Sequence, residues 1–208
     1  MSQPVYIVGA GGHGKVVFDT LRNMGRAVAG FLDAATDKVG RNYMGTKVHD
    51  QETTLKSISP ADYQLANGIG SVSVRRRFYI EARAMGFAFL RIVHPAATVS
   101  DDANLAQGVQ IMAGCVVQPG ARISENCLIN TSASIDHDCD LGAHVFVGPG
   151  ATLCGTVTVG TGSHVGTGAT ILEDLSIGED ATVGGGAMVV KSVPDGVTVV
   201  GVPAREVK

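Results

Sequence analysis

The chain has 208 residues and a formal net charge of −3 at pH 7, and hydrophobic residues make up 45% of it against 17% for charged ones. This composition excludes an intrinsically disordered chain, and the charge argues against a nucleic-acid surface, which needs clustered cations. No apolar run reaches the roughly 18 residues of a membrane span and no signal-peptide pattern opens the chain, so a cytoplasmic location is expected.

The first part of the chain alternates between strand and helix patterns. Strands are expected at residues 4–8, 27–33 and 87–93, with helices from the glycine-rich loop to about residue 24 and over 74–85. This order is typical of a small Rossmann-like β-α-β-α-β layer. We therefore expect an α/β domain over residues 1–95. The basic run at 75–77 is expected to form a solvated helix face; the alternative is that it reaches phosphates.

A glycine-rich loop follows the first expected strand. Gly9, Gly11 and Gly14 match the spacing G-x-G-x-x-G, and Asp33 follows about twenty residues later. Alone, this pattern indicates a dinucleotide, but about 95 residues supply only one mononucleotide-binding half. Glycines and a helix N-terminus also suit a pyrophosphate. We interpret the loop as a nucleotide-sugar site; the alternative is that the glycines only permit a tight turn.

An aliphatic residue recurs at every sixth position of the second part of the chain. The sixteen positions are Val99, Leu105, Ile111, Val117, Ile123, Ile129, Ile135, Leu141, Val147, Leu153, Val159, Val165, Ile171, Ile177, Val183 and Val189. Two residues before each lies a mostly small side chain, from Ala97 to Ala187, with Leu175 the large exception. Residues two apart share one face of a strand, so each six-residue unit directs one aliphatic and one small side chain inward.

Three such units would close one triangular coil, with successive coils about one strand spacing, roughly 4.8 Å, apart. Residues 96–208 are therefore predicted to form a parallel β-helix, which makes the chain mainly β. Cys115, Cys127 and Cys139 occupy positions of the small inward-facing side chains, here named the small inward lane, where thiols act as apolar filler. Their spacing suggests reduced thiols rather than disulfides or a zinc ribbon. A β-helix serving only as a scaffold or adhesive surface is the structural alternative.

The six-residue pattern is the hexapeptide repeat, and nearly the whole chain resembles one branch of the hexapeptide-repeat acetyltransferases. This branch is the sialic-acid O-acetyltransferase-like family with its nucleotide-4-aminosugar N-acetyltransferases. The matching blocks are residues 7–14, 31–33, 69–70, 129–131, 135–139, 184–187 and the tail 201–205. The resemblance implies a left-handed coil, acetyl-CoA as co-substrate, no metal, and a homotrimer with active sites between neighbouring β-helices.

The same resemblance implies site residues. The residues expected to hold the nucleotide part of the sugar donor are Gly11, Gly12, His13, Asp33 and Gly70, with Asn130 near the sugar. His137 matches the catalytic base, and Asp138 follows it where many relatives carry Glu. The residues expected at acetyl-CoA are Phe146, Gly155, Thr167 and Gly185.

The chemistry of acetyl transfer suits these residues. An amine or hydroxyl that attacks a thioester must lose a proton, and histidine titrates near neutral pH. A neighbouring carboxylate can orient the ring. Gly155 lies eighteen residues after His137, hence one coil above it, where a backbone N–H could stabilise the thioester oxyanion. Direct transfer in a ternary complex is expected, because Cys139, though close to His137, lies in the inward lane, while Cys154 adjoins Gly155.

One position departs from the family pattern. Many relatives carry a second histidine near the thioester, where this chain has Phe146, which cannot donate a hydrogen bond. His164, one coil above Phe146, and His144, two residues before it, are the two side chains that could compensate. The departure concerns the geometry at the cofactor and leaves the expected reaction class unchanged.

The leading hypothesis is N-acetylation of a nucleotide-linked 4-amino-4,6-dideoxysugar for surface-glycan synthesis. The alternatives are O-acetylation of sialic acid or a related sugar, and a non-catalytic partner of a sugar-biosynthesis enzyme. A γ-type carbonic anhydrase would need zinc on His137, His144 and His164, but offsets of 7 and 20 residues do not place them in one column.

Overall fold

The computed structural model describes residues 3–207. The chain divides into two compact units, and the division falls between Pro95 and Ala96. Over the described residues, no helix has the length and apolar character needed to cross a bilayer.

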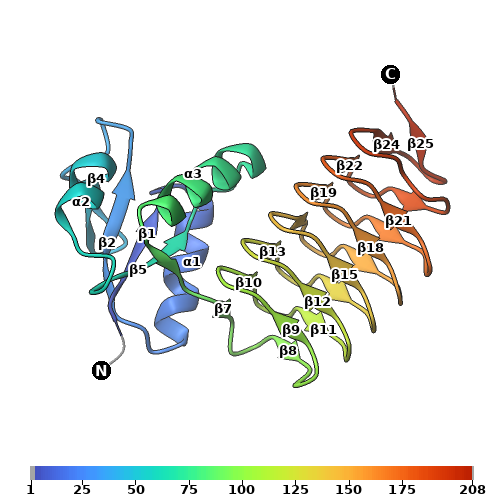
Figure 1. The fold of residues 1–208 in the computed structure, drawn as a ribbon, viewed down its shortest axis with the longest axis horizontal. Helices are drawn as coiled ribbons and strands as arrows, with labels where there is room; N and C mark the ends of the chain where they lie inside the picture. The colour runs from blue at the N-terminus through green and yellow to red at the C-terminus, as the bar shows by residue number, and fades with distance from the viewer. Residues whose placement is uncertain (1–2, 208) are drawn as a thin grey trace. The chain divides into compact units, whose positions relative to one another are not determined.

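The first unit is a six-stranded sheet with three helices (Figure 1). Its elements in chain order are β1 (Val5–Val8), α1 (Gly12–Asn23), β2 (Val28–Asp33), β3 (Asn42–Tyr43), β4 (Thr46–Asp50), α2 (Gln51–Ser57), β5 (Gln64–Asn67), α3 (Val72–Ala84), β6 (Ala88–Phe89) and β7 (Ile92–Val93). The strand order is β3-β4-β2-β1-β5-β6, parallel except for the β3–β4 hairpin, and β7 is not part of this sheet.

The Rossmann-like layer is confirmed, and it is larger than the sequence pattern indicated. β3, β4, α2 and β5 were not expected, and the single strand expected at 87–93 is two short strands. Alternation along β1 sends Tyr6 and Val8 into a core with Leu55 of α2 and Phe78 of α3. The opposite side of the sheet carries Phe31, which stacks on Phe18 of α1 at 5.6 Å between ring centroids.

Arg75 corrects the expectation of a solvated basic face on α3. Its side chain is only 1% exposed, whereas Arg77 is exposed. Phe78 and Tyr79 follow it by three and four residues, so all three lie on the buried face of the helix. The backbone carbonyl of Arg75 also accepts a hydrogen bond from Asn67 Nδ2 at 3.2 Å.

The second unit is a left-handed parallel β-helix with three flat faces, shown in Figure 1 as a stack of triangular coils. Face 1 comprises β10 (Gln110–Ile111), β13 (Leu128–Ile129), β16 (Phe146–Val147), β19 (His164–Val165), β22 (Thr182–Val183), β24 (Thr198–Val200) and β25 (Arg205–Glu206). Face 2 comprises β8 (Thr98–Val99), β11 (Val116–Val117), β14 (Ser134–Ile135), β17 (Thr152–Leu153), β20 (Thr170–Ile171) and β23 (Met188–Val189). Face 3 comprises β9 (Asn104–Leu105), β12 (Arg122–Ile123), β15 (Asp140–Leu141), β18 (Thr158–Val159) and β21 (Ser176–Ile177).

The strand register confirms the predicted coil. Val117 pairs with Ile135 and Ile135 with Leu153, so each coil takes 18 residues (135 − 117). The six-residue aliphatic lane is buried from Leu105 to Val189, and only Val99, in the first coil, is half-exposed.

The corners of the coil form a third periodic lane. From Gly108 to Gly186, every sixth residue has a positive φ, between 49° and 76°. Glycine adopts this left-handed conformation easily, and Asn and Asp tolerate it better than other residues. The members that are not glycine are Asn126, Ser132, Asp138, His144, Thr156, Asp174 and Asp180. Asp138, next to His137, and His144 are thus both corner residues.

The last coil ends in an antiparallel turn. β25 pairs with β24, with Val199 opposite Glu206. The tail also returns to face 2, where Ala204 N donates to Met188 O at 2.7 Å and Met188 N donates to Gly201 O at 3.0 Å. The final edge of the stack is thereby covered by chain from its own tail.

Candidate active site

The four glycines of the loop, Gly9, Gly11, Gly12 and Gly14, serve different purposes in the first unit. Gly9 has φ +101°, which only glycine adopts readily. A Cβ on Gly14 would lie 2.1 Å from the carbonyl oxygen of Gly9, so α1 can approach β1 only without a side chain there. Gly11 and Gly12 have open space where a Cβ would stand. Two glycines therefore build the turn, and the other two leave the start of α1 accessible.

A cavity of about 370 Å³, here named the glycine-loop cavity, opens at this turn. Gly11, Gly12, His13, Asp33 and Gly70 all line it. The structure thus gathers the five residues expected to hold a nucleotide. They come from the carboxyl ends of β1, β2 and β5, the edge where doubly wound sheets bind nucleotides.

Lys38 is the cation that the sequence analysis overlooked in this cavity. Its Nζ lies 2.9 Å from Asp33 Oδ2. Asp33 Oδ2 also accepts from Ala10 N at 2.8 Å, and Oδ1 accepts from Ala35 N at 2.9 Å. Burial raises the pKa of Asp33, but the hydrogen bonds from Ala35, Lys38 and Ala10 outweigh it and lower that pKa overall. Asp33 therefore ties the glycine loop to the loop after β2 and holds Lys38 beside the cavity.

His137 and Asp138 form a hydrogen-bonded pair at a corner between face 2 and face 3, named here the His137 corner (residues 136–139 with the corners stacked on them). Nδ1 of His137 lies 3.0 Å from Oδ2 of Asp138, and the two side chains are 58% and 65% exposed. A carboxylate acceptor requires the proton on Nδ1, which leaves Nε2 as the basic nitrogen. Asp136 Oδ1 accepts from the backbone N–H of His137 at 2.8 Å and fixes the chain before the ring.

The charges around His137 favour its protonated form. The hydrogen bond that His137 donates to Asp138 is the largest influence and raises the pKa of His137. Partial desolvation opposes it, while the negative charges of Asp136, Asp138 and Asp174 raise the pKa further. The ring is therefore a stronger base than an isolated histidine.

Two glycines make room for this pair. A Cβ on Gly155 would lie 2.5 Å from both Nε2 and Cε1 of His137, so the ring edge rests against bare backbone one coil above. A Cβ on Gly120, one coil below Asp138, would lie 2.3 Å from its Oδ1. The sequence analysis named Gly155 and missed Gly120, although the 18-residue step from Asp138 leads to it.

Thr156 and Asp174 continue the His137 corner upward, and the sequence analysis named neither. The N–H of Thr156 donates to His137 O at 2.9 Å, and its hydroxyl donates to Asp174 Oδ1. Thr156 is β-branched yet has φ +62°, an uncommon conformation for such a residue. The left-handed corner lane was the signal that leads to both residues.

The residues expected at acetyl-CoA do not lie together in one chain. Thr167 and Gly185 stack at a different corner, between face 1 and face 2, where a Cβ on Gly185 would lie 3.3 Å from Thr167 O. Phe146 lies on face 1 and stacks on His164 of the next coil, with ring centroids 4.5 Å apart and planes 10° apart. Asn130 lies at a corner leading from face 1 to face 2, and its Oδ1 accepts from Thr131 N at 2.8 Å.

His144 is buried, at 6% exposure, and its Nδ1 lies 3.0 Å from Asn126 Nδ2. Of the two histidines considered as substitutes at Phe146, His164 stacks on that side chain.

The inward cysteines are poor nucleophiles. Cys139 is buried and donates its S–H to Cys154 O at 3.1 Å. Burial raises its pKa to about 11, so the thiolate is scarce near neutral pH. Cys154 is half-buried, and burial raises its pKa as well. Neither thiol is activated as a covalent acyl carrier would be.

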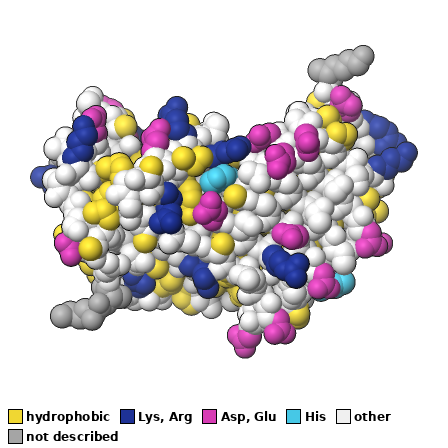
Figure 2. Space-filling view, in the orientation of Figure 1, with side chains coloured by type: hydrophobic (Ala, Val, Ile, Leu, Met, Phe, Trp, Pro, Cys, Tyr) yellow, Lys and Arg dark blue, Asp and Glu magenta, His cyan; other side chains and the backbone are white. Residues whose placement is uncertain are grey.

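Within residues 3–207, no three His, Cys, Asp or Glu side chains converge as metal ligands. Figure 2 shows acidic and basic side chains interspersed on the face in view, without a continuous basic field.

Comparisons with known proteins agree over the length of the chain. Residues 4–82 match the family model of the PglD N-terminal domain. The perosamine N-acetyltransferase of Caulobacter crescentus, solved with CoA and GDP-perosamine, is 36% identical, covers 100% of this chain and 98% of its own, and superposes with a TM-score of 0.94.

Two further solved structures are similar. The acetyltransferase domain of PglB from Neisseria gonorrhoeae is 36% identical, covers 99% of this chain and 100% of its own, and has a TM-score of 0.93. WeeI from Acinetobacter baumannii is 27% identical with a TM-score of 0.83, covering 99% of this chain and 100% of its own.

Proposed function

The chain belongs to the family of hexapeptide-repeat acetyltransferases with a PglD-type N-terminal domain, and from this membership we propose that it transfers the acetyl group of acetyl-CoA to the 4-amino group of a nucleotide-linked 4-amino-4,6-dideoxysugar. The observation that carries the proposal is the His137–Asp138 pair against Gly155. It stands in a chain that matches, end to end, one N-acetyltransferase solved with CoA and a nucleotide aminosugar.

His137 acts as the general base in this proposal. Asp138 accepts a hydrogen bond from Nδ1–H and holds the ring, so the lone pair on Nε2 points away from the carboxylate. Nε2 takes the proton that the attacking amine must lose. The imidazolium formed is stabilised by Asp138, with Asp136 and Asp174 nearby.

Gly155 supplies the oxyanion donor. Among the described residues, no acceptor binds its N–H, whereas its carbonyl accepts from Asp174 N at 3.2 Å. Because Gly155 has no side chain, the ring of His137 can rest against its backbone. A fixed backbone donor beside the base suits the charge that develops on the thioester oxygen.

The glycine-loop cavity binds the nucleotide part of the donor sugar. Its volume of about 370 Å³ lies within the usual range of small-ligand sites. The N-terminus of α1 and Lys38 offer positive charge to a diphosphate. Gly11 and Gly12 leave the approach to that helix end open.

The corner that carries Thr167 and Gly185 fits acetyl-CoA. Both residues are exposed, and within residues 3–207 neither backbone N–H meets an acceptor. Two such donors, one coil apart, suit the two amide carbonyls of a pantetheine arm. Phe146, whose ring stacks on that of His164 in the next coil, adds an apolar surface on face 1. Bound there, acetyl-CoA supplies the acetyl group.

The proposed homotrimer would bring these separated residues together. Face 2 lies between the His137 corner and the corner of Thr167 in one chain. If the corners of neighbouring chains meet, one chain's base and another's cofactor donors complete a site. Light scattering should then give three times the chain mass of 21.4 kDa; a monomeric active enzyme would contradict this.

Thiol release from acetyl-CoA tests the function directly. The panel comprises UDP-, dTDP- and GDP-linked 4-aminosugars, with sialic acid and CMP-sialic acid. We expect one 4-aminosugar nucleotide to react rapidly, and His137→Ala to lose on the order of 10²–10⁴-fold in kcat. Asp140→Ala, an exposed change on face 3, is the control. Turnover with sialic acid alone would assign O-acetylation instead, and full activity of His137→Ala would refute the general base.

A further inference from the structure

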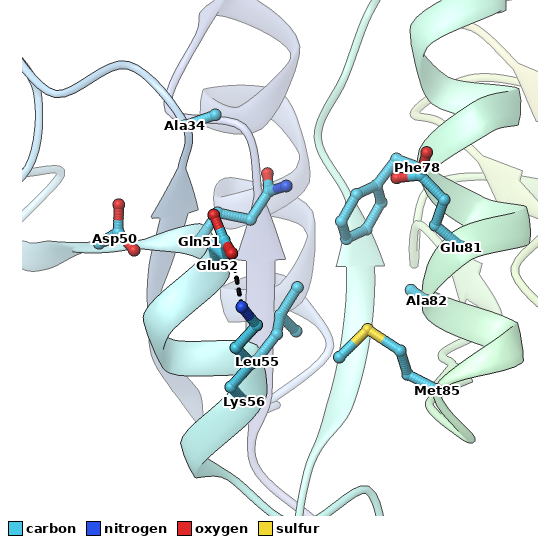
Figure 3. Close-up of a pocket in the computed structure, with 10 residues that line it drawn as sticks. All are labelled: Ala34, Asp50, Gln51, Glu52, Leu55, Lys56, Phe78, Glu81, Ala82 and Met85. Atoms are coloured by element: carbon cyan, nitrogen blue, oxygen red, sulfur yellow. Dashed lines mark hydrogen bonds and ion pairs between the residues drawn. The ribbon is translucent and has the colours of Figure 1, made fainter.

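A second cavity lies in the first unit, between α2 and α3 (Figure 3). Its volume is about 350 Å³, close to that of the glycine-loop cavity. Leu55 of α2 points across it toward Phe78 of α3 and Met85, which directly follows α3. Nothing in the proposed acetyl transfer uses this α2–α3 cavity.

The two cavities adjoin each other. Ala34, directly after β2, and Gln51, the first residue of α2, line both of them. Ala34 is exposed and small, so it leaves the junction open. A ligand held at the glycine loop can therefore extend between the two helices.

Charge differs between the two cavities. Asp50, Glu52 and Glu81 line the α2–α3 cavity, with Lys56 as its cation. Carboxylates repel phosphate. In the glycine-loop cavity the one carboxylate, Asp33, is paired with Lys38 at 2.9 Å, and the N-terminus of α1 offers backbone N–H groups. The diphosphate of a sugar nucleotide thus belongs at the glycine loop, and the uncharged, hydrogen-donating end of the ligand belongs between α2 and α3.

The three carboxylates are not equally available. Asp50 Oδ1 already accepts from Thr53 N at 2.8 Å as the cap of α2, and Glu52 pairs with Lys56 at 2.5 Å. Glu81 has a long ion pair with Arg77, 3.9 Å between Oε1 and Nε. Glu81, three residues after Phe78 on α3, therefore offers carboxylate oxygens beside an apolar ring.

We propose that the α2–α3 cavity binds the nucleobase of the sugar nucleotide and that Glu81 selects guanine. This inference rests on the proposed function. Leu55, Phe78 and Met85 provide apolar walls for a flat ring. Guanine presents two adjacent donors, N1–H and the 2-amino group, which match the two oxygens of one carboxylate, whereas uracil and thymine present a single N–H. A base without these donors leaves the carboxylate unsatisfied.

Blocking the junction tests the placement. We expect Ala34→Trp to raise the KM for the sugar nucleotide by about tenfold or more, with little change in kcat, as loss of ground-state binding predicts. Thr36→Trp is the matched control, because Thr36 is exposed in the same loop and lines neither cavity. An unchanged KM in Ala34→Trp would show that the ligand does not extend between the helices.

Calorimetry with GDP, UDP and dTDP tests the base preference without requiring turnover. GDP should bind about tenfold or more tightly than the others, and Glu81→Gln should bring the affinities within about threefold of one another. Glu52→Gln, whose carboxylate is paired with Lys56, is the control. Equal affinities in the unaltered protein would overturn the guanine assignment. If the affinities are equal and the protein also acetylates a UDP- or dTDP-linked aminosugar, the guanine assignment fails while the proposed function stands.

Discussion

At the residue scale, the reactivity of His137 depends on its immediate neighbours rather than on burial. The side chain is more than half exposed, yet Asp138, Asp136 and Asp174 raise its pKa. A base must be unprotonated to act, so kcat/KM is full above this raised pKa and falls as the pH drops through it.

Replacing Asp138 with Asn removes the charge and weakens the hydrogen bond to Nδ1. The pKa of His137 should fall, which moves the acid limb of the kcat/KM profile to lower pH. The plateau should also drop, by about tenfold or more, because the ring loses its orienting carboxylate. The pH profile of kcat/KM measures both effects.

Asp140→Asn is the matched control, since Asp140 is an exposed acid two residues away on face 3. Its profile should coincide with that of the unaltered enzyme. An acid limb that stays in place in Asp138→Asn would show that Asp138 does not set the ionisation of His137.

Gly155 and His137 should be energetically coupled. A methyl group on Gly155 would stand 2.5 Å from Nε2, so Gly155→Ala should push the exposed ring aside and lower kcat by on the order of 10²-fold. In a His137→Ala background the same change should have far less effect, because there is no ring to displace. The coupling is measured from kcat of the two single variants and the double variant. If the losses in activation free energy were strictly additive, ring displacement would be contradicted.

Single residues of the site divide into those the sequence predicts and those it does not. His137, Asp138 and Gly155 follow from a family resemblance and an 18-residue step. Gly120 and Thr156 act through contacts between coils, which a motif search along the chain does not register. The buried side chain of Arg75 was missed because a run of three arginines reads as solvated unless the helix phase is fixed by Phe78 and Tyr79.

At the scale of elements, the β1–α1 turn depends on one glycine more than on the others. A Cβ at Gly14 would meet the Gly9 carbonyl at 2.1 Å, and a backbone atom cannot yield as a side chain does. Gly14→Ala should lower the free energy of unfolding by about 3 kcal/mol. A drop in Tm measured by thermal denaturation checks this.

Gly12→Ala is the matched substitution at the same turn. Nothing stands within 4 Å of its Cβ position, so folding should be unaffected while the nucleotide approach narrows. A KM effect without a Tm effect is the expected result. Equal destabilisation by the two variants would mean that close packing of α1 on β1 is not what Gly14 provides.

Elements were predictable where one period dominates. The β-helix repeats six residues without interruption, so two inward lanes identified its strands. β4 and β5 lack the alternation of buried and exposed residues that marks a strand in a sequence. Only Val48 of the five residues of β4 is buried, and three consecutive residues of the short β5 are buried. The third lane, at the corners, mixes Gly with Asp, Asn, Ser, Thr and His, which hides it from a search for hydrophobic period.

At the scale of the whole molecule, the coil behaves as a repeating unit. Deleting residues 100–117 removes 18 residues and joins Val99 to Gln118, which reproduces the junction after Val117 in the next coil. Every inward lane stays in register, so this shortened chain should keep a cooperative thermal transition.

Deleting 101–117, one residue fewer, is the control. It shifts the inward lanes by one position and would turn aliphatic side chains outward. Circular dichroism during heating should show a much lower Tm, or no transition, for this variant. Similar melting of the two shortened chains would mean that lane register does not govern stability.

The tail that folds back over the last coil also has a consequence for solubility. A stack of parallel coils has no intrinsic end, because each finished coil presents the hydrogen-bonding edge on which another could be laid. β25 runs antiparallel to β24, and residues 201–204 pair with Met188. The reversed strand occupies that edge with a direction that no further coil can continue. It thereby prevents one molecule from serving as the template on which the next would polymerise end to end.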